Sequence, residues 1–120
     1  MLRFARPALV TTLALAGLLA GCSTVEEDKT ANWTPEHIYT EARDEAQSGG
    51  YEQAVPLFEK LEGRAAGTPL AQQAQLEKAY AQYKSGEKAQ AVATLDRFMK
   101  LHPSSPAYDY ALYLKGITNF

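Results

Sequence analysis

Residues 37 positions apart in this chain of 120 residues match in size and chemistry, and this internal repeat restricts the possible folds more than any other feature. A period of this length is typical of stacked supersecondary units, each of which buries its apolar face against its neighbours. The matching positions hold small residues, turn glycines, large apolar residues and hydroxyl–proline pairs: Ala42 with Ala79 and Gly116, Gly49 with Gly86, Ala54 with Ala91, Phe58 with Leu95, Leu61 with Phe98, and Thr68-Pro69 with Ser105-Pro106.

Each unit is predicted to be a pair of helices joined by a tight turn. Apolar residues recur at helical spacing after Trp33, and no alternating strand pattern competes. Thr34, Thr68 and Ser105 each precede a proline, so each can cap a helix that begins with that proline. Glycines at 49–50 and 86 supply the turns that end helices.

These patterns predict an all-α, tetratricopeptide-like helix–turn–helix solenoid of about two and a half repeats, slightly longer per unit than the roughly 34-residue tetratricopeptide repeat. The first repeat covers about 34–66, the second about 69–103, and a third begins near Pro106. The sequence ends at Phe120, inside an apolar helix without a partner, so we expect an incomplete domain over 34–120 of marginal stability, the N-terminal portion of a longer protein.

One proline conflicts with the helical pattern. Pro56 lies a few residues into the second helix of the first repeat. A proline inside a helix costs about 3 kcal/mol unless it falls in the first turn. We therefore expect that this helix either starts late, near Gln53, or is kinked at Pro56.

The only cysteine, Cys22, follows a short apolar segment in the run Leu-Ala-Gly-Cys, which is the pattern of a bacterial lipoprotein signal. Arg3 and Arg6 give the positive start, and the apolar stretch is shorter than a membrane-spanning helix requires. We expect residues 1–21 to be removed and the Cys22 thiol to carry diacylglycerol, with an N-acyl chain on its new amine. A secretory signal that happens to contain a cysteine is the alternative. By resemblance to known lipoproteins, Ser23 after the cysteine favours the outer membrane, with the folded part on its periplasmic face.

Residues 22–33 are expected to form the lipidated cysteine and a flexible tether, because 23–32 are polar and acidic. The formal net charge is -2 and no run of basic residues occurs, which argues against nucleic-acid binding. A lipidated Cys22 would leave no thiol for a disulfide or a Cys-based metal site.

Two stretches carry a more specific resemblance, Asp96-Arg97-Phe98-Met99-Lys100-Leu101-His102-Pro103 and Asp109-Tyr110-Ala111-Leu112-Tyr113-Leu114-Lys115-Gly116. Together with the lipoprotein signal they closely resemble the BamD family, the tetratricopeptide lipoproteins of the outer-membrane β-barrel assembly machinery. The resemblance implies an outer-membrane scaffold that helps to receive and insert unfolded outer-membrane proteins, with BamA and the other assembly lipoproteins as partners. No BamA-contact residue carries over, because those repeats lie largely beyond Phe120. Two alternatives are a pilotin-type lipoprotein for secretin or pilus assembly and a repeat module of a cell-wall enzyme.

The same resemblance implies that the first helices of the repeats bind the C-terminal signal of a client, an extended segment that ends in an aromatic residue. On repeat geometry the candidates for this groove are aromatic or cationic: Tyr39, Arg43, Tyr80, Tyr83 and Tyr113. Arg43 could meet a terminal carboxylate through a charge-assisted hydrogen bond. Aromatic residues at helical spacing are more often core residues, and this alternative is favoured for Tyr80 and Tyr83.

The chain shows no catalytic constellation. His37 and His102 lack Cys or His neighbours at metal-ligand spacing, and Ser104-Ser105 lacks a nucleophile motif. No phosphate-binding glycine loop occurs either. We therefore predict no enzyme activity, no metal site and no cofactor other than the covalent lipid on Cys22.

Overall fold

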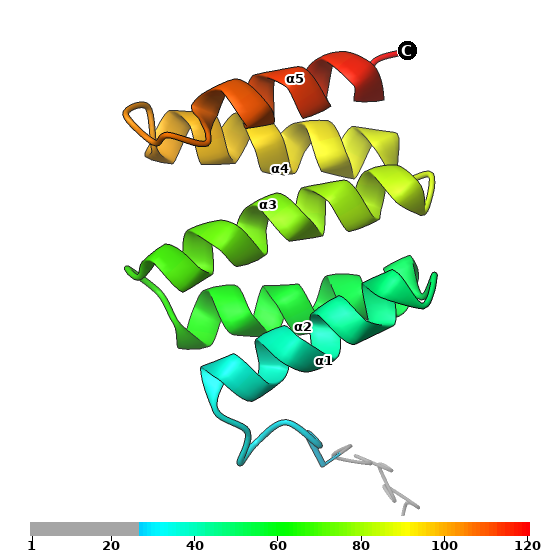
Figure 1. Cartoon of the computed structure of the whole chain (residues 1–120), viewed down its shortest axis with the longest axis vertical. Helices are drawn as coiled ribbons and strands as arrows, with labels where there is room; N and C mark the ends of the chain where they lie inside the picture. Colours follow the sequence, from blue (N-terminus) through cyan, green and yellow to red (C-terminus); the bar gives the residue numbers. More distant parts are fainter. Residues whose placement is uncertain (1–26) are drawn as a thin grey trace, which may run out of the picture.

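The computed structural model describes residues 27–120, which form a single stack of five helices without strands (Figure 1). Each helix packs mainly against the helices before and after it, with α3 in the middle of the stack. The predicted lipidation site Cys22 and the predicted signal segment 1–21 lie outside the described residues. The helices are α1 (Pro35–Gln47), α2 (Tyr51–Arg64), α3 (Pro69–Lys84), α4 (Lys88–Leu101) and α5 (Tyr108–Thr118).

The helix pairs confirm the predicted all-α repeat. α1 and α2 form the first repeat, α3 and α4 the second, and α5 is the first helix of the third. The residues that share a register across repeats are fully buried at corresponding places: Ala42 and Ala79, Ala54 and Ala91, Phe58 and Leu95, Leu61 and Phe98. All of them except Ala91 belong to two apolar clusters, one centred on α1 and α2 and one on α4 and α5, and α3 contributes to both. The 37-residue period in the sequence thus corresponds to two copies of one packing arrangement in the structure.

The threonine caps are present as predicted, whereas the serine cap is not. The Thr34 hydroxyl accepts a hydrogen bond from the His37 N–H at 3.2 Å, and Thr68 accepts one from the Ala71 N–H at 3.3 Å. Ser105 instead accepts from the Ala107 N–H at 3.1 Å within a turn, and α5 begins only at Tyr108. The Ser105-Pro106 pair therefore belongs to the connection before α5.

The two turn glycines of the repeat adopt the same left-handed conformation. Gly49 has φ = 90° and Gly86 has φ = 86°, a region that costs residues with a Cβ atom free energy. The third small residue of the register behaves differently from its counterparts. Gly116 is exposed, and a Cβ atom added there would meet no atom within 4 Å. Among the described residues, no other helix packs closely against this position of α5.

Pro56 lies inside α2, which already begins at Tyr51. The expectation of a late start near Gln53 is therefore wrong. The proline removes the N–H that would bond to the Glu52 carbonyl four residues earlier. Both residues are exposed, so water can satisfy that carbonyl and the helix continues to Arg64.

The structure differs from the predicted tether at residues 28–33, which pack against α2 and are called the N-terminal strap here. Asp28 forms ion pairs with Lys60 at 2.6 Å and with Arg64 at 3.2 Å. Arg64 also donates to the Thr30 carbonyl and hydroxyl, and Thr30 is buried. The strap ends at Trp33, whose ring stacks on His37 at 4.3 Å between centroids. Asp28 therefore holds residues 28–33 against α2 and does not only keep them solvated.

The two stretches that carry the family resemblance contact each other. Asp96 of α4 pairs with Lys115 of α5 at 2.6 Å, and Phe98 packs in the same buried cluster as Ala111 and Leu114. This contact fastens the third repeat to the second. Within residues 27–120, none of the helices has both the length and the apolar composition needed to cross a bilayer.

Candidate functional site

Three adjoining hollows follow the face formed by the first helices of the repeats, and we call them together the first-helix groove. Their volumes are about 190, 270 and 380 Å³ from α1 toward α5. Arg43 and Gln47 line the first two hollows, and Glu77 and Tyr80 line the second and third. The shared residues make the hollows one continuous surface across three repeats.

Helical spacing explains why these side chains meet. Tyr39 and Arg43 are four residues apart on α1, and Glu77 and Tyr80 are three apart on α3, so each pair shares one face of its helix. The Arg43 guanidinium lies 5.6 Å from the centre of the Tyr39 ring, within cation–π range. Gln73 and Tyr110 extend the same surface at its α5 end.

An ion pair lies at the centre of the groove. The Arg43 Nε is 3.7 Å from Glu77 Oε1, which joins the first repeat to the second. The other carboxylate oxygen, Glu77 Oε2, is buried and has no hydrogen-bond partner among residues 27–120. A buried acceptor without a partner costs folding free energy, so the described residues leave this carboxylate incompletely satisfied.

Burial governs the acid–base behaviour of the groove. It raises the pKa of Glu77 above its ordinary value, although the Tyr39 hydroxyl and the Arg43 charge oppose that shift. Burial also raises the pKa of Tyr39, with the Glu77 charge as a further cause. Burial also raises the pKa of Tyr110, and the nearby Tyr80 is the second cause of that shift. The groove is therefore partly desolvated, which strengthens any polar contact made inside it.

The aromatic side chains of the groove pack on one another and still expose surface. Tyr80 meets Tyr51 edge-on at 6.2 Å and Tyr83 at 6.4 Å between ring centroids. Its exposed fraction is nonetheless 39%. Tyr110 lines the largest of the three hollows opposite Tyr80 and is also exposed. An aromatic side chain of a ligand could insert between these two rings.

The five predicted groove residues divide into two sets. Tyr39, Arg43 and Tyr80 line the hollows, so the structure brings them together. Tyr83 is half-buried and packs against the cluster of α4 and α5. Tyr113 is 64% exposed on α5 and lines none of the hollows described. A binding role for any of them stays a prediction.

Two residues that line the groove, Glu77 and Tyr110, were not among the predicted set. Glu77 lies four residues after Gln73 and three before Tyr80, so helical spacing places all three on one face. Tyr110 lies three residues before the predicted Tyr113 and points to the groove in its place. The sequence alone did not indicate which faces of α3 and α5 turn toward the groove, because that depends on how the helices pack.

The arrangement provides binding surfaces rather than reactive groups. Among residues 27–120, no group of three or more His, Cys, Asp or Glu side chains is placed to hold a metal ion. His37 stacks on Trp33 and pairs with Glu41 at 3.5 Å, and His102 follows the end of α4. Neither histidine lies in the first-helix groove.

Stacked helix pairs with a continuous groove along their first helices define the class of helical repeat proteins that bind polypeptide segments. The family model described as "Tetratricopeptide repeat" matches residues 26–120, and the chain belongs to this family.

The chain is also similar to curated proteins named "Outer membrane protein assembly factor BamD". It is 45% identical over 117 residues to the one from Neisseria meningitidis serogroup B, covering 93% of this chain and 44% of the relative. The Vibrio cholerae protein of that name is 36% identical, covering 88% and 45%, and the Xylella fastidiosa 9a5c protein is 34% identical, covering 92% and 38%. The chain thus spans less than half the length of these relatives.

Proposed function

We propose that this chain is part of an outer-membrane-anchored scaffold for the assembly of outer-membrane proteins. Two things support this: the similarity to proteins named as outer membrane protein assembly factors, and a fold whose groove suits extended polypeptides. In this role the protein is not an enzyme, since a scaffold contributes binding surfaces. The similar proteins reported above do not favour the pilotin and cell-wall-enzyme alternatives.

The groove is proposed to bind the C-terminal segment of an unfolded outer-membrane protein. The observation that carries this proposal is the gap between Tyr80 and Tyr110, lined also by Glu77 and about 380 Å³ in volume. A terminal aromatic side chain would fill that gap, and main-chain N–H groups would donate to the exposed part of the Glu77 carboxylate, which lines it. A terminal carboxylate would have to share Arg43 with Glu77, since these two already pair.

The anchor and the partners complete the proposal. Diacylglycerol and an N-acyl chain on Cys22 would hold the protein on the periplasmic face of the outer membrane, because two or more chains give stable binding. BamA and the other assembly lipoproteins would be its partners. Purification of the lipidated full-length protein from outer membranes tests this part: recovery of BamA supports it, and recovery of a secretin without BamA contradicts it.

The groove is tested with a labelled ten-residue peptide that ends in Phe, by fluorescence anisotropy. Tyr80→Ala should weaken binding about 5- to 10-fold, as expected for loss of an aromatic contact of about 1 kcal/mol. Leu112→Ala is the matched control, because Leu112 is 54% exposed and lies outside the groove. Equal effects of the two substitutions would contradict the proposed site.

The charge of the peptide terminus gives a second, sharper comparison. Arg43→Gln should weaken the free-acid peptide and leave its C-terminal amide unchanged. Glu77→Gln should strengthen the free acid, because it removes a competing and repelling carboxylate. If the acid and the amide respond alike to both variants, the terminal carboxylate does not bind at Arg43.

A further inference from the structure

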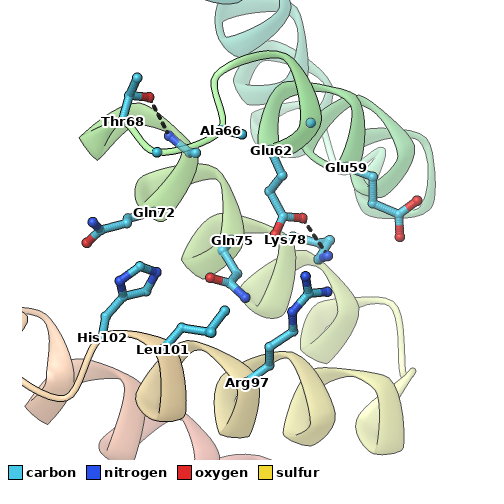
Figure 2. A pocket seen from close by; sticks show the side chains of 13 residues that line it. Glu59, Glu62, Ala66, Thr68, Gln72, Gln75, Lys78, Arg97, Leu101 and His102 are labelled. Carbon is cyan, nitrogen blue, oxygen red and sulfur yellow. Dashed lines mark hydrogen bonds and ion pairs between the residues drawn. The ribbon is translucent and has the colours of Figure 1, made fainter.

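A second and larger groove lies on the other side of α3, between α2 and α4 (Figure 2). Its volume is about 720 Å³, and it is lined mainly by polar and charged side chains. Arg97, Leu101 and His102 reach it from α4 and its end, and these three belong to one of the stretches that carry the family resemblance. We call it the second-helix groove. The function proposed above makes no use of it.

The floor of this groove holds a well-buried ion pair. Lys78 Nζ lies 2.6 Å from Glu62 Oε2, and the exposed fractions of the two side chains are 11% and 19%. Arg97 points from α4 toward this pair and forms no ion pair of its own within residues 27–120 (Figure 2). Glu62 already neutralises Lys78, so Arg97 is the cation that a bound molecule would meet.

Gln75 lies in the middle of the groove, and its side-chain amide has no hydrogen-bond partner among the described residues. The residue is only 4% exposed, yet its side-chain amide makes no hydrogen bond to any residue in 27–120. Figure 2 places it beside Leu101, between His102 and Arg97. An amide carries both donors and an acceptor, so it matches the N–H and C=O of one extended peptide unit. The polar atoms of Gln75 are not among the fully buried side-chain atoms without a partner, so they open to the groove, where a ligand could take the place of water.

We propose that the second-helix groove binds an extended polypeptide segment of another protein. The Gln75 amide would bond to its main chain, and an acidic side chain would pair with Arg97. The lining carries two acids, Glu59 and Glu62, against two bases, so a polyanion such as a nucleic acid would gain little there. A neutral main chain with one acidic side chain fits this balance.

This groove is independent of the first-helix groove. Gln75 and Glu77 are two residues apart, and on a helix of 3.6 residues per turn their side chains point about 200° apart. α3 therefore forms a wall of both grooves, and two polypeptides could bind at the same time. Substitutions in one groove should leave the other unaffected, which separates this proposal from the function proposed above.

Gly63 provides a way to block the groove without disturbing the fold. It lies on α2 in the groove lining, and a Cβ atom added there would meet nothing within 4 Å. Gly63→Leu would place a side chain in the space that the peptide occupies. Gly116→Leu is the matched control, since Gly116 is also helical, equally open, and outside the groove.

The test selects linear 12-residue peptides from a random phage-displayed library on the purified chain, with deselection on the Gly63→Leu variant. A synthetic peptide from this selection is then measured by anisotropy. We expect Gly63→Leu and Gln75→Leu to weaken it at least about tenfold, and Gly116→Leu to leave it unchanged. Arg97→Gln should weaken it about fivefold and have no effect on a peptide whose acidic residue is replaced by its amide. Circular dichroism establishes that each variant is folded.

Three results would overturn the proposal. The selection could yield no peptide whose binding depends on Gly63. The selected peptides could lose affinity with Tyr80→Ala instead, which would assign them to the first-helix groove. Vesicles of phosphatidylglycerol and phosphatidylethanolamine could bind the chain and lose affinity with Gly63→Leu, which would make the groove a lipid site.

Discussion

The Lys78–Glu62 ion pair gives the most quantitative prediction for the stability of this fold. It joins α2 to α3 at 2.6 Å, with side-chain exposures of 11% and 19%. The Asp96–Lys115 pair joins α4 to α5 at the same distance, but its side chains are 49% and 32% exposed. The two pairs therefore have matched geometry and differ in burial.

Burial should decide what each substitution costs. Breaking a buried pair costs about 3–5 kcal/mol, because it leaves one charge without a partner, whereas exposed pairs contribute about 0.2–1 kcal/mol. Lys78 is largely but not fully buried, so we expect Glu62→Gln to cost about 2 kcal/mol of unfolding free energy. Lys78→Met should cost about 1 kcal/mol, because Glu62 is more exposed and Arg97 points toward it. Asp96→Asn should cost about 0.5 kcal/mol.

Urea unfolding followed by circular dichroism measures these differences, and Glu62→Gln should also lower Tm by about 10 °C. The double variant Glu62→Gln/Lys78→Met completes a double-mutant cycle. It should lie within about 1 kcal/mol of the unsubstituted chain, since no charge is then left unpaired. Additive single effects, or equal losses from Glu62→Gln and Asp96→Asn, would refute the argument from burial.

Three further predictions follow from the turns, the strap and the groove. Gly49→Ala and Gly86→Ala should each cost about 1–2 kcal/mol in urea unfolding, because both have positive φ, whereas Gly63→Ala should stabilise α2 by about 0.5–1 kcal/mol. Hydrogen bonds from Lys60 and then Thr30 hold the pKa of Asp28 well below its ordinary 3.8. The strap's contribution to the unfolding free energy is therefore complete above pH 3.8 and is lost as the pH falls through the pKa of folded Asp28. Acrylamide quenching of Trp33 should rise as that contribution is lost, and Asp28→Asn should give the raised quenching already at neutral pH. Burial raises the pKa of Glu77 above its ordinary 4.5, so the unfolding free energy should fall as the pH rises from 4.5 through the pKa of Glu77 in the folded chain. If the Glu77→Gln variant shows the same fall, another group causes it.

The fold was predictable because its information is local and repeated. The register of Ala54, Phe58 and Leu61 with their counterparts predicted buried positions that the structure confirms. Thr34 and Thr68 predicted two helix starts, since a cap needs only the next three residues. The prediction of a helix start at Ser105 was wrong because a hydroxyl residue before proline also suits a turn. Whether such a pair begins a helix or forms a turn depends here on how α5 packs.

The features that were missed depend on residues far apart in sequence. The strap is held by Asp28 through contacts with residues 32 and 36 positions further along the chain, so from sequence Asp28 looked like part of a solvated tether. Glu77 looked like an ordinary charged residue of a helix, and only the folded stack brings it beside Arg43 of α1 and partly buries it. Gln75 likewise gave no sign of its burial, since glutamine is usually exposed.

The strap also sets how far the folded repeats could move from a lipid on Cys22. A free tether ending at Trp33 would reach about 38 Å when extended, whereas a chain fixed at Asp28 reaches about 21 Å. The volume open to the first repeat shrinks roughly with the cube of that reach, by about sixfold. A client segment or partner held at the membrane surface would therefore meet the grooves at a correspondingly higher effective concentration. Lys60 and Arg64, which line neither groove, would control how often that encounter occurs.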